Sequence, residues 1–218
     1  MEQILNDVEV RVLGSLIEKG IATPEYYPLT LNALTRACNQ KSNRHPVVSF
    51  DEKAVVRAVE GLMDRKLARR VIGDDSRVPK YRHIVTEAFA FTEPEVAAVC
   101  MLLLRGPQTP GEIRGRAERL YSFGSLEEVE STLRGLMDRA AGPLVVQLPR
   151  QPGRKESRYA HLFSGEIEVE QAELLEPAAL EVHAENERIA SLEHEVESLR
   201  QEIEDLRQEF AEFRKQFE

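Results

Sequence analysis

The sequence contains no tryptophan and only two cysteines among its 218 residues, Cys38 and Cys100. Each cysteine falls within an apolar helical pattern, so we expect two reduced, buried side chains and no disulfide or metal pair. No apolar run approaches the roughly 18 residues that a membrane-spanning helix requires. The first residues, Met1 to Gln3, lack the basic and apolar regions of a signal peptide. The sequence therefore predicts a cytoplasmic protein without a membrane partner.

Motifs typical of enzyme active sites are also missing. The chain has no glycine-rich loop that would cradle a phosphate, and no His or Cys spacing suited to zinc. Cys38 and His45 are one conceivable pair of nucleophile and base, but Cys38 lies on the apolar face of a predicted helix, which favours packing. We therefore expect no enzyme activity, no catalytic residue, no metal site and no cofactor.

The negative charge is confined to the end of the chain. The formal net charge is -9, yet residues 1–85 hold 14 Lys and Arg against 11 Asp and Glu, and residues 86–165 hold 10 of each. Residues 166–218 hold 5 basic residues against 17 acidic ones. Because the acidic excess is remote, the total charge does not exclude a polyanionic partner for the first two thirds of the chain.

Two long segments of the chain resemble each other. The sequence Gly-Leu-Met-Asp-Arg occurs at residues 61–65 and again at 135–139. Flanking residues also align, since Glu9-Val10, Leu13, Leu16, Ile17 and Gly20 correspond to Glu95-Val96, Val99, Leu102, Leu103 and Gly106. The repeat predicts two homologous units, at residues 1–85 and 86–165.

The first unit has the pattern of three helices followed by a hairpin. Apolar residues at helical spacing predict a helix that Asp7 caps and that ends at Gly20, and a second helix over residues 31–38. A capping box at residues 49–52 starts a third helix, which runs to about Lys66. Two strand-like segments on either side of a turn-rich stretch then form a hairpin; they cover residues 67–72 and 80–84.

The second unit repeats this order, with predicted helices at 93–104, 109–120 and 125–139 and strands at 144–148 and 157–163. Three helices and a hairpin make a winged helix, in which the third helix and the hairpin commonly contact DNA. The predicted fold is therefore mainly α with small β-hairpins. It consists of tandem winged-helix domains, a linker over residues 166–180 and a C-terminal coiled-coil helix over residues 181–218.

Several segments resemble the YceH family of bacterial proteins of unassigned function. The resemblance covers essentially the whole chain and rests on the segments 13–19, 23–32, 38–44 and the Gly-Leu-Met-Asp-Arg motif. It implies tandem winged-helix domains, in agreement with the helix and strand pattern. It supplies neither catalytic residues nor an established ligand.

The C-terminal segment has a heptad pattern from Val182 onward, with β-branched residues at the first core position and Leu at the second. This pattern favours a parallel two-stranded coiled coil. In that arrangement the flanking charges attract, as in Arg188 with Glu193 and Glu195 with Arg200. The alternatives are a helix that packs on its own chain and a solvated acidic tail. The predicted homodimer contacts are Ile189, Leu192, Val196, Leu199, Ile203, Leu206, Phe210 and Phe213.

Basic residues lie off the buried stripe of the third helix of the first unit and along its hairpin, where Lys and Arg would attract phosphates. For the loop before this helix, turn chemistry is an equal alternative. Every basic residue could also be an ordinary solvated one. The candidate nucleic-acid-binding residues are Lys41, Asn43, Arg44, Lys53, Arg57, Arg69, Arg70, Arg77, Lys80 and Arg82.

The favoured function is double-stranded DNA binding by a dimer, as a transcriptional regulator or a chromosome-associated adaptor. The second unit also has a basic hairpin, but Glu127, Glu128 and Glu130 on its third helix favour packing or partner binding. The alternative is a protein–protein interaction scaffold without direct DNA contact, which the net charge favours.

Overall fold

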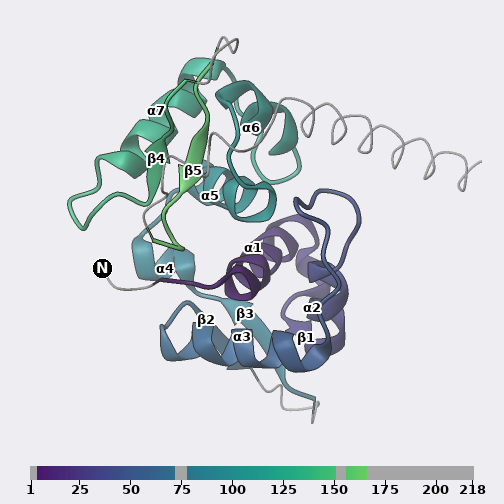
Figure 1. Ribbon diagram of the computed structural model, residues 1–218. Helices are drawn as coiled ribbons and strands as arrows, with labels where there is room; N and C mark the ends of the chain where they lie inside the picture. Colours follow the sequence, from purple (N-terminus) through teal and green to yellow (C-terminus); the bar gives the residue numbers. More distant parts are fainter. Residues whose placement is uncertain (1–3, 72–77, 151–155, 166–218) are drawn as a thin grey trace, which may run out of the picture. The chain divides into compact units, whose positions relative to one another are not determined.

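The computed structural model describes residues 4–71, 78–150 and 156–165, which all belong to one compact unit within residues 1–173. This unit is mainly helical and carries small antiparallel sheets (Figure 1). The predicted linker and coiled-coil helix lie outside the described residues. The same holds for all the predicted dimer contacts, from Ile189 to Phe213.

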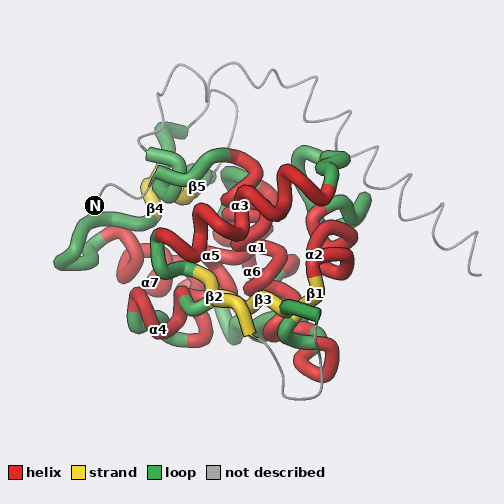
Figure 2. The backbone as a smooth tube through the Cα atoms, turned by 90° about the horizontal axis from the view of Figure 1, so that it is seen from below, coloured by secondary structure: helices red, strands yellow, loops and turns green. Residues whose placement is uncertain are grey.

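The first repeat contains the predicted three helices and hairpin, and residues 27–30, whose sequence predicts a short extended piece, include a two-residue strand. A one-turn 3-10 helix before that strand and a further helix at the end were not predicted. The second helix of this repeat has the predicted bounds. The elements are α1 (Asp7–Ala22), η1 (Pro24–Tyr26), β1 (Leu29–Thr30), α2 (Leu31–Cys38), α3 (Glu52–Asp64), β2 (Ala68–Val71), β3 (Lys80–His83) and α4 (Val85–Phe89). Strand β3 lies between β1 and β2 and is antiparallel to both (Figure 2).

The second repeat follows the same order, although its middle helix is shorter than the predicted 109–120. Its strands form a separate two-stranded sheet. The elements are α5 (Glu93–Arg105), α6 (Pro110–Arg116), α7 (Leu126–Met137), β4 (Val145–Gln147) and β5 (Tyr159–His161).

The arginine of the repeated Gly-Leu-Met-Asp-Arg motif forms the same ion pair in both repeats. In the first, Glu9 uses one carboxylate oxygen to cap α1 through the Asn6 backbone N–H and the other to bind Arg65, 2.8 Å away. In the second, Glu95 accepts from the Thr92 backbone N–H and binds Arg139 at 3.1 Å. The arginine of the motif thus fastens the end of each third helix to the start of each first helix.

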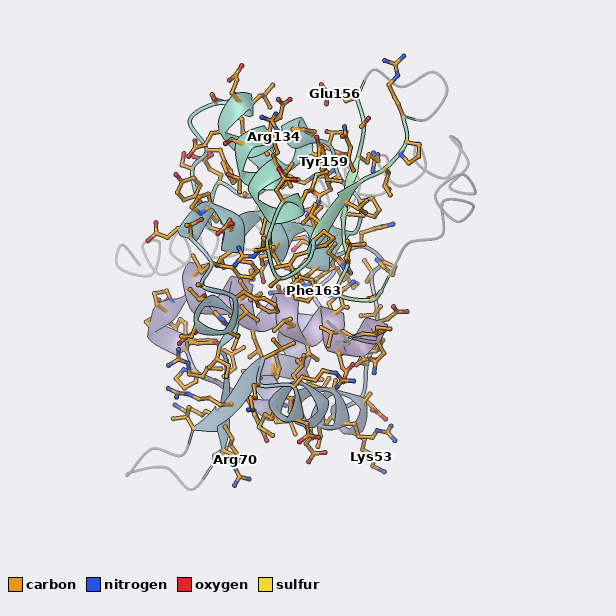
Figure 3. All side chains as sticks on the ribbon, turned by 90° about the vertical axis from the view of Figure 1, so that its left-hand side faces the viewer. Lys53, Arg70, Arg134, Glu156, Tyr159 and Phe163 are labelled. Atoms are coloured by element: carbon orange, nitrogen blue, oxygen red, sulfur yellow. The ribbon has the colours of Figure 1, made fainter. Side chains whose placement is uncertain are left out.

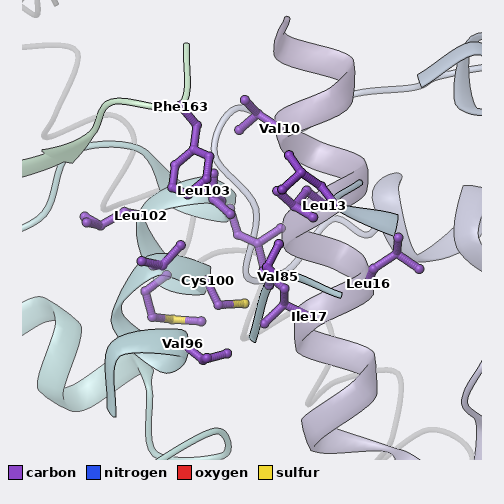
Figure 4. Close-up of a cluster of buried hydrophobic side chains, with 14 of the residues drawn as sticks. Val10, Leu13, Leu16, Ile17, Val85, Val96, Cys100, Leu102, Leu103 and Phe163 are labelled. Carbon is purple, nitrogen blue, oxygen red and sulfur yellow. The ribbon is translucent and has the colours of Figure 1, made fainter. Parts of the chain in front are cut away.

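Helices α1 and α5 pack directly against each other and join the two repeats. The Cys100 thiol donates to the Gly14 carbonyl oxygen at 3.5 Å, and a Cβ on Gly14 would lie 2.8 Å from Leu104 Cδ2. Leu13 and Ile17 of α1 meet the side chains of α5 in one buried cluster (Figure 4). A residue larger than glycine at position 14 would therefore force the two helices apart.

Equivalent positions of the two repeats meet where α1 and α5 pack together. The alignment that pairs Glu9 with Glu95 also pairs Gly14 with Cys100, so equivalent positions of the two repeats touch each other. Contact between equivalent positions is the property of an isologous interface, in which two like units are related by a two-fold axis. At least one pair of equivalent positions therefore lies at the contact between the two repeats.

Candidate nucleic-acid interface

The sheet of the first repeat presents a basic face to solvent. In the β2–β3 pairing Arg69 lies opposite Arg82, and Val71 lies opposite Lys80, so these four residues share one face. The other face carries Ala68, Arg70, Tyr81 and His83. Ala68 and Tyr81 are buried there, at 3% and 9% exposed, whereas Arg70 is exposed. Arg82 is not fully available on the basic face, because its Nη2 binds Glu87 Oε1 at 2.8 Å.

Helix α3 adds an exposed charged stripe at the end of the unit where β2 also lies. Its inner stripe of Val55, Val59 and Leu62 is buried, while Lys53 and Arg57 are exposed on the opposite side. Figure 3 shows Lys53 together with Arg70 of β2 at this end, both pointing away from the rest of the chain. The exposed residues in the later turns of α3 are acidic: Glu60 and Asp64. The positive charge is therefore concentrated in the first half of the helix.

Arg44, which is among the candidate nucleic-acid-binding residues predicted from the sequence, does not belong to this surface. The structure shows that this prediction is wrong. Its side chain is completely buried, and its guanidinium binds the Glu18 carboxylate, the Ala37 carbonyl oxygen and the Gln40 side chain. A guanidinium with its donors occupied inside the protein is not available to a phosphate. Arg44 holds its loop against α1.

The loop that precedes α3 is fixed by side-chain contacts to its surroundings. Asn39 and Phe50 exchange two hydrogen bonds of 2.8 Å, so the ends of the loop are tied together. Arg11 of α1 donates to the Pro46 carbonyl oxygen at 2.6 Å, and Asn43 accepts from Arg105 of α5. These contacts favour turn chemistry for Asn43, which also has a positive φ of 58°. Of the candidates in this loop, Lys41 and Asn43 are exposed, and Lys41 is the charged one of the two.

Several residues that lie on, or hold together, the elements of the candidate interface were not identified from the sequence. Arg36 is exposed in the last turn of α2 and could have been found, because it lies off the apolar stripe of that helix. Glu18 and Arg11 had no such signal, since their partners lie more than 25 positions away in the sequence. Arg77, which we predicted in the hairpin turn, lies outside the described residues.

The histidines at the ends of β3 and β5 add no positive charge to the sheets at neutral pH. Burial lowers the pKa of His83 to about 4, with Glu87 opposing the shift and Arg82 adding to it. Burial also lowers the pKa of His161, the equivalent residue of the second repeat, to about 4. Both imidazoles are neutral near pH 7. The candidate interface therefore owes its charge to lysine and arginine.

The two cysteines are poor candidates for chemistry. Burial raises the pKa of Cys38 to about 11 and raises that of Cys100 further. A thiol that keeps its proton is a weak nucleophile and a weak metal ligand. Over the part of the chain that the structure describes, no three His, Cys, Asp or Glu side chains are grouped as metal ligands, and no helix has the length and apolarity to cross a bilayer.

Comparison with known proteins places the chain in a family. The model of the family described as "Protein of unknown function, DUF480" matches residues 5–154, which include both repeats up to the second hairpin. The chain belongs to the DUF480 family. This match agrees with the long specific segments found in the sequence, and it leaves the activity of the family open.

Relatives within the DUF480 family carry the name UPF0502 protein. Those of Geobacter sulfurreducens and Geotalea uraniireducens are 58% and 59% identical over 199 residues, or 90% of this chain and 90% of theirs. A relative from Vibrio atlanticus is 48% identical over 200 residues, or 90% of this chain and 92% of its own. Since 90% of this chain extends past residue 173, the similarity includes part of the C-terminal segment.

Proposed function

We propose that this chain binds double-stranded DNA, as a transcriptional regulator or a chromosome-associated adaptor built from tandem winged-helix modules. The observation that carries the proposal is a set of exposed cations on two elements of the first repeat that pack against each other, α3 and β2. Lys53 and Arg57 of α3 and Arg69 and Arg70 of β2 are exposed there. Cations placed so can neutralise neighbouring phosphates and release their counterions.

The element order supports the winged-helix assignment. In each repeat a third helix is followed by an antiparallel hairpin, and a winged helix places these two elements against the grooves and backbone of DNA. Under this proposal α3 enters the major groove and the outer face of the β2–β3 hairpin lies along the phosphates. The resemblance to the YceH family, which implies the same modules, remains a prediction.

Fluorescence anisotropy with a labelled random duplex tests the proposal. Wild-type chain should bind at low salt, and the affinity should fall steeply as salt is raised. The charge reversals Arg57→Glu and Arg82→Glu should weaken binding, whereas Arg119→Glu, at an exposed position of the second repeat, is the matched control. If duplex is bound and these reversals change neither affinity nor salt slope, the contact surface is assigned wrongly.

A protein-interaction scaffold is the second candidate, and the mixed charge of the third helices favours it. Glu60 and Asp64 follow the two cations of α3, and Glu127 and Glu130 are exposed on α7. Acidic groups at these positions repel phosphates and suit a basic protein partner. Absence of duplex binding at low salt would favour this function over DNA binding.

Under either function we propose that two chains associate through a parallel coiled coil. The support is the heptad pattern between Val182 and Phe217. Sedimentation of the full chain should give a dimer, and a chain that ends at Glu176 should give a monomer. If both forms sediment as monomers, the C-terminal segment does not dimerise.

A further inference from the structure

We infer that one chain engages a DNA duplex through the first-repeat end alone, while the equivalent end of the second repeat faces away from it. This inference rests on the proposed function and specifies the form of its partner: one continuous stretch of duplex per chain. The two repeats do not read two half-sites together. Three features lead to this conclusion, namely the order of the helices, the direction of their exposed faces and the charges at equivalent positions.

The helices that carry the two candidate DNA faces lie on opposite sides of the α1–α5 pair. Helix α3 packs on α1, α1 packs on α5, and α5 packs on α7. Packed helices are spaced by roughly 8–10 Å, so three such steps separate the α3 and α7 axes by at most roughly 24–30 Å. Figure 1 shows α3 and α7 at opposite ends of this arrangement.

The exposed faces of α3 and α7 are turned in opposite directions. Each helix buries one apolar stripe toward the α1–α5 pair, with Val59 in α3 and Leu133 in α7 fully buried. The side chains opposite these stripes therefore point outward on either side. Figure 3 shows Lys53 of α3 and Arg134 of α7 at opposite ends. A straight duplex that touches one face cannot touch the other.

The contacts between the repeats oppose a rotation that would turn the second face toward the first. Gly14 and Cys100 touch at the centre of the crossing, and the backbone N–H of Leu5 donates to the Phe163 carbonyl oxygen at 2.7 Å. The His45 backbone N–H also donates to the Leu104 carbonyl oxygen at 2.9 Å. Because these three contacts join the repeats at separate places, a hinge between them would have to break buried contacts.

The charges at equivalent positions show which face suits DNA. Aligning the shared motif pairs Lys53 with Glu127 and Arg57 with Ser131. The first turns of α3 thus present Lys53 and Arg57, beside an exposed Glu52, where α7 presents an acid and a neutral hydroxyl. Later in the helices the order reverses, since Glu60 of α3 aligns with Arg134 of α7. A glutamate at the position that would approach phosphate opposes binding electrostatically. The first-repeat face is therefore the one that binds, although the two repeats share one architecture.

This arrangement differs from that of a dimeric regulator whose two recognition helices face the same side of the DNA and read half-sites about one turn apart. Here a single chain covers only one contact region. Full affinity per chain therefore needs a duplex of only about one to two helical turns. Any inverted repeat in a target would reflect two chains.

Matched charge variants of the full chain test the inference by anisotropy on a 20-bp labelled duplex at low salt. Lys53→Glu should weaken binding by about tenfold or more and reduce the salt slope. Its counterpart Glu127→Lys should leave the dissociation constant within about twofold of wild type. The second-repeat reversals Arg134→Glu and Arg150→Glu should also leave it unchanged within that margin.

The outcomes separate this inference from the proposed function. If wild-type chain does not bind the duplex, the proposed function fails, and the inference fails with it. If wild-type binds and Glu127→Lys strengthens binding while Arg134→Glu weakens it as much as Lys53→Glu does, DNA binding stands and the one-ended arrangement is overturned. Circular dichroism of each variant identifies any loss of binding that comes from unfolding.

Discussion

The guanidinium of Arg44 lies against the carboxylate of Glu18, with Nη2 2.7 Å from Oε2 and Nη1 3.0 Å from Oε1. Burial acts to raise the pKa of Glu18, but the hydrogen bonds and charge of Arg44 outweigh it and lower that pKa overall. The carboxylate therefore stays ionised inside the protein. This pair joins the loop before α3 to the middle of α1.

Replacing Arg44 with alanine should destabilise the protein strongly. Removal of Arg44 leaves the buried Glu18 charge with only Lys19, whose Nζ lies 3.3 Å from Oε2, so the loss should be about 3 kcal/mol, at the lower end for a broken buried pair. The free energy of unfolding from urea titration measures this loss, and Lys41→Ala in the same loop is the control because Lys41 is exposed. Equal stabilities of the two variants would contradict a structural role for Arg44.

The two glycines of the repeated motif should respond oppositely to alanine. A Cβ at Gly61 would collide with Glu9 Oε1, whereas at Gly135 the nearest atom, Glu95 Oε1, is 3.9 Å away. The Glu9 carboxylate would have to move aside and weaken its ion pair with Arg65, so Gly61→Ala should destabilise by about 1 kcal/mol. Gly135→Ala should be neutral or stabilise by up to about 1 kcal/mol, because alanine favours the helix. Thermal unfolding measures the change in stability of both variants. An equal loss of stability in the two would contradict the prediction.

Removing the carboxylate of Glu87 should tighten duplex binding. Glu87 binds Arg82 at 2.8 Å and is exposed, so Glu87→Gln frees a cation on the outer face of the sheet and removes a negative charge beside it. We expect a severalfold lower dissociation constant and a steeper dependence on salt. Glu156→Gln, in the hairpin of the second repeat, removes an equal charge and should have no such effect.

Stability should decline between pH 6.5 and pH 4 because of the two buried histidines. His83 and His161 have folded-state pKa values of about 4, against 6.5 for an unperturbed histidine. Below pH 6.5 the unfolded chain takes up protons that the folded chain refuses, so stability is full above pH 6.5 and is lost as pH falls toward 4. Thermal midpoints measured across this range should fall less steeply in His161→Gln than in wild type. An unchanged slope in that variant would count against the prediction.

Local patterns accounted for most of the helices. Helix α2 has the predicted bounds because its apolar stripe and the Thr30 cap are both encoded within ten residues. The cap of α1 is Asn6, one residue before the predicted Asp7, because Asn6 completes a capping box with Glu9. Helix α4 was not predicted, since its five residues are too few to show a period.

The candidate site was predicted less completely, because exposure depends on the whole fold. Lys53 and Arg57 were recognisable as outward residues from their place on α3 alone. Arg44 looked equally available in the sequence, since nothing near it shows that Glu18, on another element, occupies its guanidinium. A repeat in the sequence also does not show whether the exposed faces of its two third helices, α3 and α7, are turned in the same direction.

The bond between the Leu5 N–H and the Phe163 carbonyl oxygen bears on how the chain folds as it is synthesised. Leu5 is 1% exposed, and α1 is buried on every side from Glu9 to Glu18, partly by α5. An emerging first repeat therefore carries an uncovered apolar helix until the second repeat has left the ribosome. During that interval we expect the nascent chain to expose apolar residues of α1 to chaperones, which the folded unit buries.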